Sequence, residues 1–248
     1  MIKKAAKRIF SAWGYEIRNK VYKDIFTIRD SMEEAFNQLK NIGFYPELVI
    51  DVGAAGGTPP LQDIFGNSIF FWVEPLIEFK DQLEDLKLKF KGDYIIAALG
   101  NQQGIMQINV SHDKVGSSIL INNIQPGFKS KLREIPIDTL ENLAQQKDFT
   151  RYKKILLKVD VQGYELHVLE GAGIFLEKID VIILEVSLYN FLKDCPDFYD
   201  VIVYMKKKGF VLYDIVGGIN RPKDMALGQK DLLFVKEVGM IRNSHDWE

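Results

Sequence analysis

Asp51, Glu74 and Asp160 each lie at the carboxyl end of a short apolar segment of this 248-residue chain. The carboxyl ends of parallel strands meet at one edge of a sheet, so we expect the three carboxylates to face a common crevice. Carboxylates in such a crevice can bind a positively charged ligand, accept hydrogen bonds from sugar hydroxyls or take a proton from a substrate.

A turn of small residues follows the first apolar segment. The turn consists of Gly53, Ala54, Ala55 and Gly56. Glycine and alanine let a ligand approach the backbone closely, which a larger side chain would prevent. Pro59 and Pro60 then suit the first turn of a helix, whose free N–H groups can bind a carboxylate. The alternative is a tight strand-to-helix turn with a purely structural role.

Glu74, followed by Pro75, lies 23 residues after Asp51, where nucleoside-binding folds hold a ribose. A carboxylate there can accept from both ribose hydroxyls, which serves S-adenosylmethionine and NAD alike. Two features favour S-adenosylmethionine. Ala55 replaces the second glycine of the G-x-G-x-x-G fingerprint, and Asp51 would attract a cationic amino-acid end but repel a pyrophosphate. An NAD(P)-dependent oxidoreductase is the alternative, as is a surface role for Glu74.

Asp160, Glu185 and His112 are the candidate catalytic residues. The two carboxylates follow neighbouring apolar segments, so they can orient a substrate hydroxyl, take its proton or share a divalent cation. His112 lies in a polar loop and is a second candidate base. The alternatives are that the carboxylates cap helices or pair with Lys158, and that His112 is an ordinary exposed histidine. We predict no metal site.

Alternating strands and helices predict an α/β fold with a doubly wound, parallel sheet of about seven main strands. The expected strands are the apolar segments Leu48–Val52, Ile69–Val73, Tyr94–Leu99, Ile155–Val159, Val181–Val186, Phe210–Ile215 and Asp231–Val235. The expected helices include Leu76–Lys89, Tyr164–Glu170 and Phe198–Lys208. A further helix, Ser31–Leu39, begins with Ser31 and Glu34 at the spacing of a capping box.

Residues 100–153 interrupt this alternation. Gly104–Val110 and Arg133–Ile137 have the apolar–polar alternation of strands and predict an antiparallel excursion attached to the main sheet. The polar segment Ser111–Gly127 between them is either a substrate lid or a connecting loop.

Residues 1–24 carry a net charge of +5, which leaves −7 for the rest of the chain. Apolar residues at helical spacing make residues 1–20 a basic amphipathic helix. Such a helix either lies on an anionic membrane surface or packs on the domain or on a second subunit of a homo-oligomer. We divide the chain into a helical segment of residues 1–45, a domain of residues 46–240 and a tail of residues 241–248.

The overall composition is that of a soluble globular protein, with 47% hydrophobic and 27% charged residues. One cysteine and the lack of a membrane-spanning or secretory segment favour the cytoplasm, peripheral at the inner membrane surface if residues 1–20 bind it. The net charge of −2 argues against a nucleic-acid partner.

Several ordered blocks between residues 46 and 190 resemble the FkbM-type methyltransferases. These blocks are Asp51–Gly56, Val73–Pro75, Ala97–Gly100, Gly116–Ser118, Ile137–Leu140, Lys158–Glu165, Leu169–Ala172 and Ile183–Val186. The resemblance implies a class I methyltransferase Rossmann-like fold, S-adenosylmethionine as cofactor, and methyl transfer, usually to a hydroxyl of an acceptor such as a sugar, a glycolipid or a polyketide.

Carried over by position, the resemblance places the methionine end of the cofactor against Asp51, Gly53, Ala54 and Gly56. It places the ribose at Glu74, the adenine beside Ala97 and Ala98, and the reacting centre at Asp160. The chain departs from the family at Ala55, where asparagine is common, and at Gln162, where glutamate is common; the latter removes one carboxylate and argues against a metal.

The expected function is therefore O-methylation of a sugar, glycan or glycolipid precursor or another small hydroxylated acceptor. A non-catalytic partner protein that keeps the cofactor fold is the remaining alternative.

Overall fold

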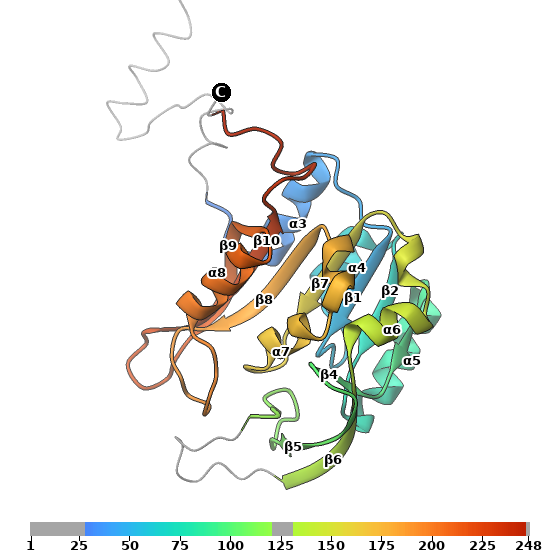
Figure 1. The fold of residues 1–248 in the computed structure, drawn as a ribbon. Helices are drawn as coiled ribbons and strands as arrows, with labels where there is room; N and C mark the ends of the chain where they lie inside the picture. The colour runs from blue at the N-terminus through green and yellow to red at the C-terminus, as the bar shows by residue number, and fades with distance from the viewer. Residues whose placement is uncertain (1–27, 121–130, 247–248) are drawn as a thin grey trace, which may run out of the picture.

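The protein is described by a computed structural model that covers residues 28–120 and 131–246 (Figure 1). The amphipathic segment predicted for residues 1–20 lies outside these described residues. None of the helices in the described ranges has the length and apolar character needed to cross a membrane.

Helices and strands alternate along most of the chain. The helices are α3 (Met32–Asn41), α4 (Pro59–Phe65), α5 (Lys80–Lys89), α6 (Leu140–Gln146), α7 (Glu165–Glu170) and α8 (Phe198–Lys207), with 3-10 turns η1 (Ile77–Phe79), η2 (Phe149–Arg151) and η3 (Gly173–Lys178). The strands are β1 (Leu48–Val52), β2 (Ile69–Val73), β3 (Gly92–Ile95), β4 (Ala98–Leu99), β5 (Gly104–Val110), β6 (Lys131–Asp138), β7 (Ile155–Val159), β8 (Val181–Ser187), β9 (Phe210–Asn220) and β10 (Leu227–Lys236).

A seven-stranded sheet forms the centre of the molecule, in the order β3-β2-β1-β7-β8-β10-β9. The five strands from β3 to β8 in this order are parallel, whereas β10 is antiparallel to both of its neighbours. The order reverses between β1 and β7, which in such sheets opens a crevice beyond the carboxyl ends of the strands. The predicted doubly wound α/β fold is confirmed, although the antiparallel direction of β10 was not predicted.

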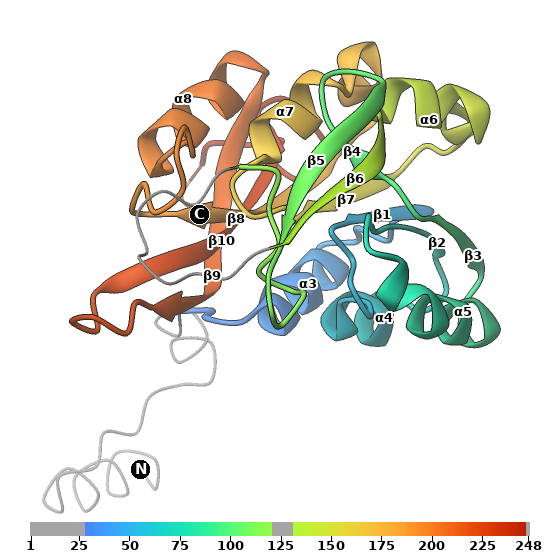
Figure 2. The same ribbon diagram turned by 90° about the horizontal axis from the view of Figure 1, so that it is seen from below.

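Helices cover both faces of this sheet (Figure 2). Alternate residues of β1 point to opposite faces, as the two-residue period of a strand requires. Leu48, Ile50 and Val52 pack in the core beneath α6, α7 and α8. Val49 packs in the core beneath α3, α4 and α5. Both faces are buried, which explains why the strands of the main sheet are almost continuously apolar.

A separate three-stranded sheet, in the order β4-β6-β5, lies at the carboxyl ends of the parallel strands (Figures 1 and 2). Strands β5 and β6 pair antiparallel, as predicted for residues 100–153, but with β4, which pairs parallel with β6, they form a sheet of their own and are not attached to the main sheet as predicted. The predicted strand Tyr94–Leu99 is divided, because β3 ends at Ile95 and β4 begins at Ala98. The small sheet has its own apolar cluster, which includes Leu76 and Ile108.

Helix α3 packs on the main sheet through fully buried Ala35, Phe36 and Leu39. Its start follows the predicted cap only in part. The Ser31 hydroxyl accepts from Glu34 N, 3.2 Å away, but the Glu34 carboxylate accepts from Asp30 N rather than from Ser31 N.

Candidate active site

The backbone at the end of β1 is hydrogen-bonded to the ends of both neighbouring strands, β2 and β7. Gly53 N donates to Val73 O over 2.9 Å, and Asp160 N donates to Val52 O over 3.0 Å. Gly53 has a φ of +73°, and a Cβ added there would lie 1.8 Å from Asp160 O. Only glycine therefore allows the first strand end and the Asp160 backbone to approach so closely.

Glu74 is buried at the tip of β2, and backbone amides hold its carboxylate. One oxygen accepts from Ala55 N over 2.9 Å and the other from Leu76 N over 2.8 Å. Burial raises the pKa of Glu74 to about 7, although the two amide hydrogen bonds oppose the shift. Glu74 thus fixes the small-residue turn, in which Ala55 has a φ of +45°, and keeps its remaining lone pairs for a ligand.

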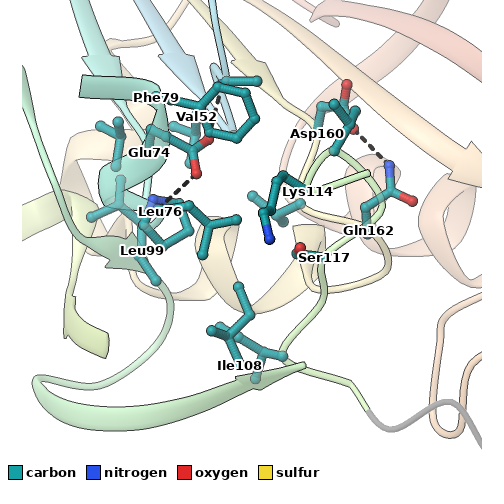
Figure 3. Close-up of a pocket in the computed structure, with 18 of the residues that line it drawn as sticks. Val52, Glu74, Leu76, Phe79, Leu99, Ile108, Lys114, Ser117, Asp160 and Gln162 are labelled. Atoms are coloured by element: carbon teal, nitrogen blue, oxygen red, sulfur yellow. Dashed lines mark hydrogen bonds between the residues drawn. The ribbon is translucent and has the colours of Figure 1, made fainter. Parts of the chain in front are cut away.

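A cleft of about 630 Å³, including its open mouth, joins these strand tips to the small sheet (Figure 3). Its lining residues are Val52, Gly53, Ala55, Val73, Glu74, Pro75, Leu76, Phe79, Ala97, Ala98, Leu99, Ile108, Lys114, Val115, Ser117, Ile119, Asp160, Val161 and Gln162. Glu74 and Asp160 therefore open onto one cleft, although they are 86 residues apart in the chain.

Asp160 is held by a neighbour on each carboxylate oxygen. Lys158 Nζ lies 3.1 Å from Oδ2, and Gln162 Nε2 donates to Oδ1 over 3.1 Å. The Asp160 side chain remains 28% exposed, so it faces the cleft, whereas Lys158 is buried beneath it. The arrangement orients one carboxylate toward a ligand.

Glu185 lies behind Gln162 and is not among the lining residues of the cleft. Its Oε2 accepts from Gln162 Nε2 over 2.7 Å and from Gln229 Nε2 over 2.9 Å. Burial, together with the charges of Asp160 and Glu165, raises the pKa of Glu185 to about 9. The structure therefore brings Glu185 next to Asp160 but separates it from the cleft by one amide side chain.

The position of Asp51 also differs from the prediction, which had this carboxylate facing the ligand. Its side chain is fully buried on the same face of the sheet as Val49, and it does not line the cleft. Lys158 Nζ lies 3.5 Å from Asp51 Oδ1, and Thr58 is a second hydrogen-bonding neighbour of this carboxylate. Burial raises the pKa of Asp51, while the Lys158 charge opposes that shift. Asp51 thus supports the turn from below.

The other predicted residues divide into two groups. Gly53, Ala55, Pro75, Ala97 and Ala98 line the cleft. Ala54, Gly56 and His112 do not. His112 is exposed in the loop that follows β5, so the structure does not bring this candidate base to Asp160.

Three features of the cleft were not predicted from the sequence. Leu76 and Phe79 form an apolar wall just after Glu74, and Lys114 contributes a positive charge from the loop after β5 (Figure 3). Lys114 stands two residues before the block Gly116–Ser118, which is the one signal that could have indicated its proximity to the site. The Ser118 hydroxyl ties this loop to β7 by donating to Gln162 O over 2.7 Å.

Comparison with known protein families identifies the family of this chain. A model described as the methyltransferase FkbM domain matches residues 51–212, more than half of the chain. The chain belongs to the FkbM methyltransferase family. The cofactor of this FkbM domain is S-adenosylmethionine, and its sheet is that of the class I methyltransferase fold. The resemblance inferred from the sequence is confirmed.

The FkbM domain of this chain also has similar solved structures, at low identity. A magnesium protoporphyrin IX methyltransferase from Synechocystis, with bound S-adenosylmethionine, is 12% identical with a TM-score of 0.43, over 90% of this chain and 87% of the other. An rRNA methylase from Streptococcus thermophilus is 10% identical with a TM-score of 0.45, over 85% of this chain and 98% of the other. Comparison with curated protein sequences gives no match.

The described residues of the FkbM cleft fit S-adenosylmethionine. The lining holds two carboxylates, Glu74 and Asp160, whose oxygens can accept hydrogen bonds from the hydroxyl and ammonium groups of this ligand. Gly53 and Ala55 leave the backbone open to the amino-acid end, and the buried Asp51 adds negative charge beneath that turn. Glu74 offers hydrogen-bond acceptors of the kind that ribose hydroxyls need, and Leu76 with Ala98 offers apolar surface.

Replacing Glu74 with alanine is predicted to weaken binding of S-adenosylhomocysteine about 100-fold, since hydrogen bonds to a charged group contribute about 1.5–3 kcal/mol each. A hydroxyl donates more strongly to an ionised than to a protonated carboxyl, so wild-type affinity should rise as the pH increases through about 7, the raised pKa of Glu74. Without ligand the same ionisation lowers stability, and the free energy of unfolding should fall as the pH rises from 4.5 to about 7.

Isothermal titration calorimetry between pH 6 and 8 measures both effects on binding. Glu84→Ala, on the exposed face of α5, is the control and should bind like the wild type. Wild-type affinity in the Glu74→Ala variant would show that this carboxylate does not contact the ligand.

Proposed function

We propose that this protein transfers a methyl group from S-adenosylmethionine to a hydroxyl oxygen of a sugar, glycan or glycolipid precursor. The observation that carries the proposal is the single cleft lined by both Glu74 and Asp160. One of these carboxylates suits a nucleoside and the other suits an acceptor, so donor and acceptor can share one space.

S-adenosylmethionine supplies an electrophilic methyl group on a sulfonium that is a good leaving group. The chain's own residues then have to hold, align and dehydrate the reactants. We assign Gly53 and Ala55 to the amino-acid end, Glu74 to the ribose, and Leu76 with Ala98 to the adenine. Phe79 and Ile108 add apolar surface that excludes water from the cleft.

Asp160 orients the acceptor hydroxyl and takes its proton. Each of its oxygens already accepts one hydrogen bond, from Lys158 or Gln162, and keeps a lone pair directed away from that donor. Glu185 does not serve as the base, because the Gln162 side chain separates it from the cleft. His112 is exposed and outside the cleft, so Asp160 alone of the three candidates lines it.

Transfer of a ¹³C-methyl group from labelled S-adenosylmethionine tests the proposal. The acceptor panel comprises neutral hexosides, hexuronosides, sugar phosphates, a glycolipid extract and bulk tRNA, with mass spectrometry to locate the label. We expect label in an O-methyl ether of a sugar-containing acceptor. Label in tRNA or on a nitrogen would refute the acceptor class. No binding of S-adenosylhomocysteine by the wild type would favour a non-catalytic partner protein.

A further inference from the structure

Lys114 is held in the wall of the cleft by a compact turn between β5 and Ser118. Ser111 N donates to Ser117 Oγ over 3.0 Å, and the Ser111 hydroxyl donates to Asp113 Oδ1 over 2.6 Å. Gly116 N also donates to Asp113 Oδ1, over 3.2 Å. Lys114 lies inside this turn with a φ of +68°, a conformation that non-glycine residues seldom adopt outside sites where the surrounding structure enforces it.

The nearest carboxylate to Lys114 is already occupied by another cation. Glu78 accepts from Arg133 through both oxygens, at 2.7 Å each, and this bidentate contact lowers the pKa of Glu78 to about 2. Lys114 Nζ lies 4.0 Å from Glu78 Oε1, at the outer limit of an ion pair. The three side chains together therefore carry one net positive charge.

The carboxylates within the cleft are also engaged elsewhere. Glu74 accepts from two backbone amides, and Asp160 pairs with Lys158. Among the described lining residues Lys114 is the one cation, and its side chain is 38% exposed. In the view of Figure 3 it lies between the Leu76 wall and the Asp160–Gln162 wall. An ammonium in this position can bind a ligand without breaking a strong ion pair within the protein.

We propose that Lys114 selects an acceptor that carries an anionic group, a carboxylate or a phosphate, close to the hydroxyl that is methylated. This inference rests on the proposed function and specifies its acceptor class as acidic. The Ser117 hydroxyl lines the same wall and can donate to the same anion. The amino-acid end of the cofactor is assigned to the Gly53 turn, whereas the charged neighbour of Lys114 is Glu78, beyond Leu76 in η1.

Calorimetry with protein saturated by S-adenosylhomocysteine tests the inference without a known acceptor. The probes are D-glucose, D-glucuronate and D-glucose 6-phosphate, which share one ring and differ in charge. We expect the wild type to bind at least one acidic probe roughly tenfold more tightly than glucose. Whether glucuronate or glucose 6-phosphate gains more distinguishes carboxylate from phosphate.

Lys114→Gln should bring the acidic probes to the affinity of glucose. Lys114→Asn is a second variant, because asparagine tolerates a positive φ and preserves the turn. Lys89→Gln, at the exposed end of α5, is the matched loss of one charge outside the cleft and should behave like the wild type.

Three outcomes would overturn the inference. The first is that the wild type binds glucose and both acidic probes equally, or binds none of them. The second is that the Lys114 variants keep a preference for the acidic probes. The third is a loss of S-adenosylhomocysteine affinity in these variants, which would reassign Lys114 to the cofactor and leave the proposed function intact. Failure of the proposed function differs from all three, since the wild type would then not bind S-adenosylhomocysteine or would methylate another class of acceptor.

Discussion

Replacing Asp160 with alanine should lower kcat for methyl transfer by roughly 100- to 10,000-fold, the usual contribution of a positioned general base. Affinity for S-adenosylhomocysteine should change by less than about threefold, because an interaction made with the reacting hydroxyl adds little to cofactor binding. Asp160→Asn keeps the shape of the side chain but cannot take the proton, so it should lose nearly as much. Single-turnover rates with an acceptor identified in the panel measure both variants.

Asp231→Asn is the matched control for this prediction. Asp231 lies opposite Glu185 in the β8–β10 pair, and burial raises its pKa to about 6, but it does not line the cleft. If removal of this neighbouring carboxylate slows the reaction as much as removal of Asp160, the effect comes from the charge of the cluster. An unchanged rate in Asp160→Ala would remove Asp160 from the mechanism altogether.

The convergence of strand ends was predictable from the sequence because it follows from topology. Apolar segments separated by helices imply parallel strands, and parallel strands bring their carboxyl ends together. Glu74 and Asp160 directly follow the last residues of β2 and β7, and both reach the cleft. Asp51 precedes the last residue of β1 and pairs in register with Trp72 and Lys158, so it lies within the sheet and is buried. Two register positions separate this buried carboxylate from the two that line the cleft beyond the strand ends.

Strand β10 was predicted at Asp231–Val235, but its antiparallel direction was not, because strand lengths are not encoded by local apolar runs. The predicted strands ended at Ile215 and began at Asp231, which left room for a crossover. In the structure β9 reaches Asn220 and β10 begins at Leu227, and this short connection suits only a hairpin. The added residues include Gly217, Gly218 and Asn220 in β9 and Gly228 and Gln229 in β10, which interrupt the apolar pattern.

The position of Lys114 could not be predicted for a different reason. Its place in the cleft depends on how the small sheet docks over the strand ends, and contacts such as Ser118 with Gln162 join residues 44 apart in the chain. Local spacing predicted β5 and β6 but carries no information about the surface on which they pack. The same limit applied to His112, which belongs to the same loop but is exposed.

Replacing Gly53 with alanine should lower the free energy of unfolding by more than about 4 kcal/mol. Losses of this size are exceptional for single substitutions and indicate a severe steric conflict. The new Cβ would lie 1.8 Å from Asp160 O and 2.8 Å from Asp160 C. These are backbone atoms that cannot rotate away, so either the strand ends separate or the domain unfolds. A variant that survives by separating them should lose S-adenosylhomocysteine binding, because Glu74 and Asp160 would no longer share one cleft.

Gly43→Ala separates this collision from the cost of the backbone conformation. Gly43 has a φ of +86°, similar to the +73° of Gly53, but a Cβ added there would meet nothing within 4 Å. Its alanine variant should therefore lose only the roughly 1–2 kcal/mol that a left-handed conformation costs an L-residue. Urea denaturation of both variants gives the difference, and calorimetry with S-adenosylhomocysteine shows which variant keeps the cleft. If Gly53→Ala and Gly43→Ala lose the same stability and both still bind S-adenosylhomocysteine, then the β1 turn and the β7 tip are not in close contact. The arrangement of the site described above would then be wrong.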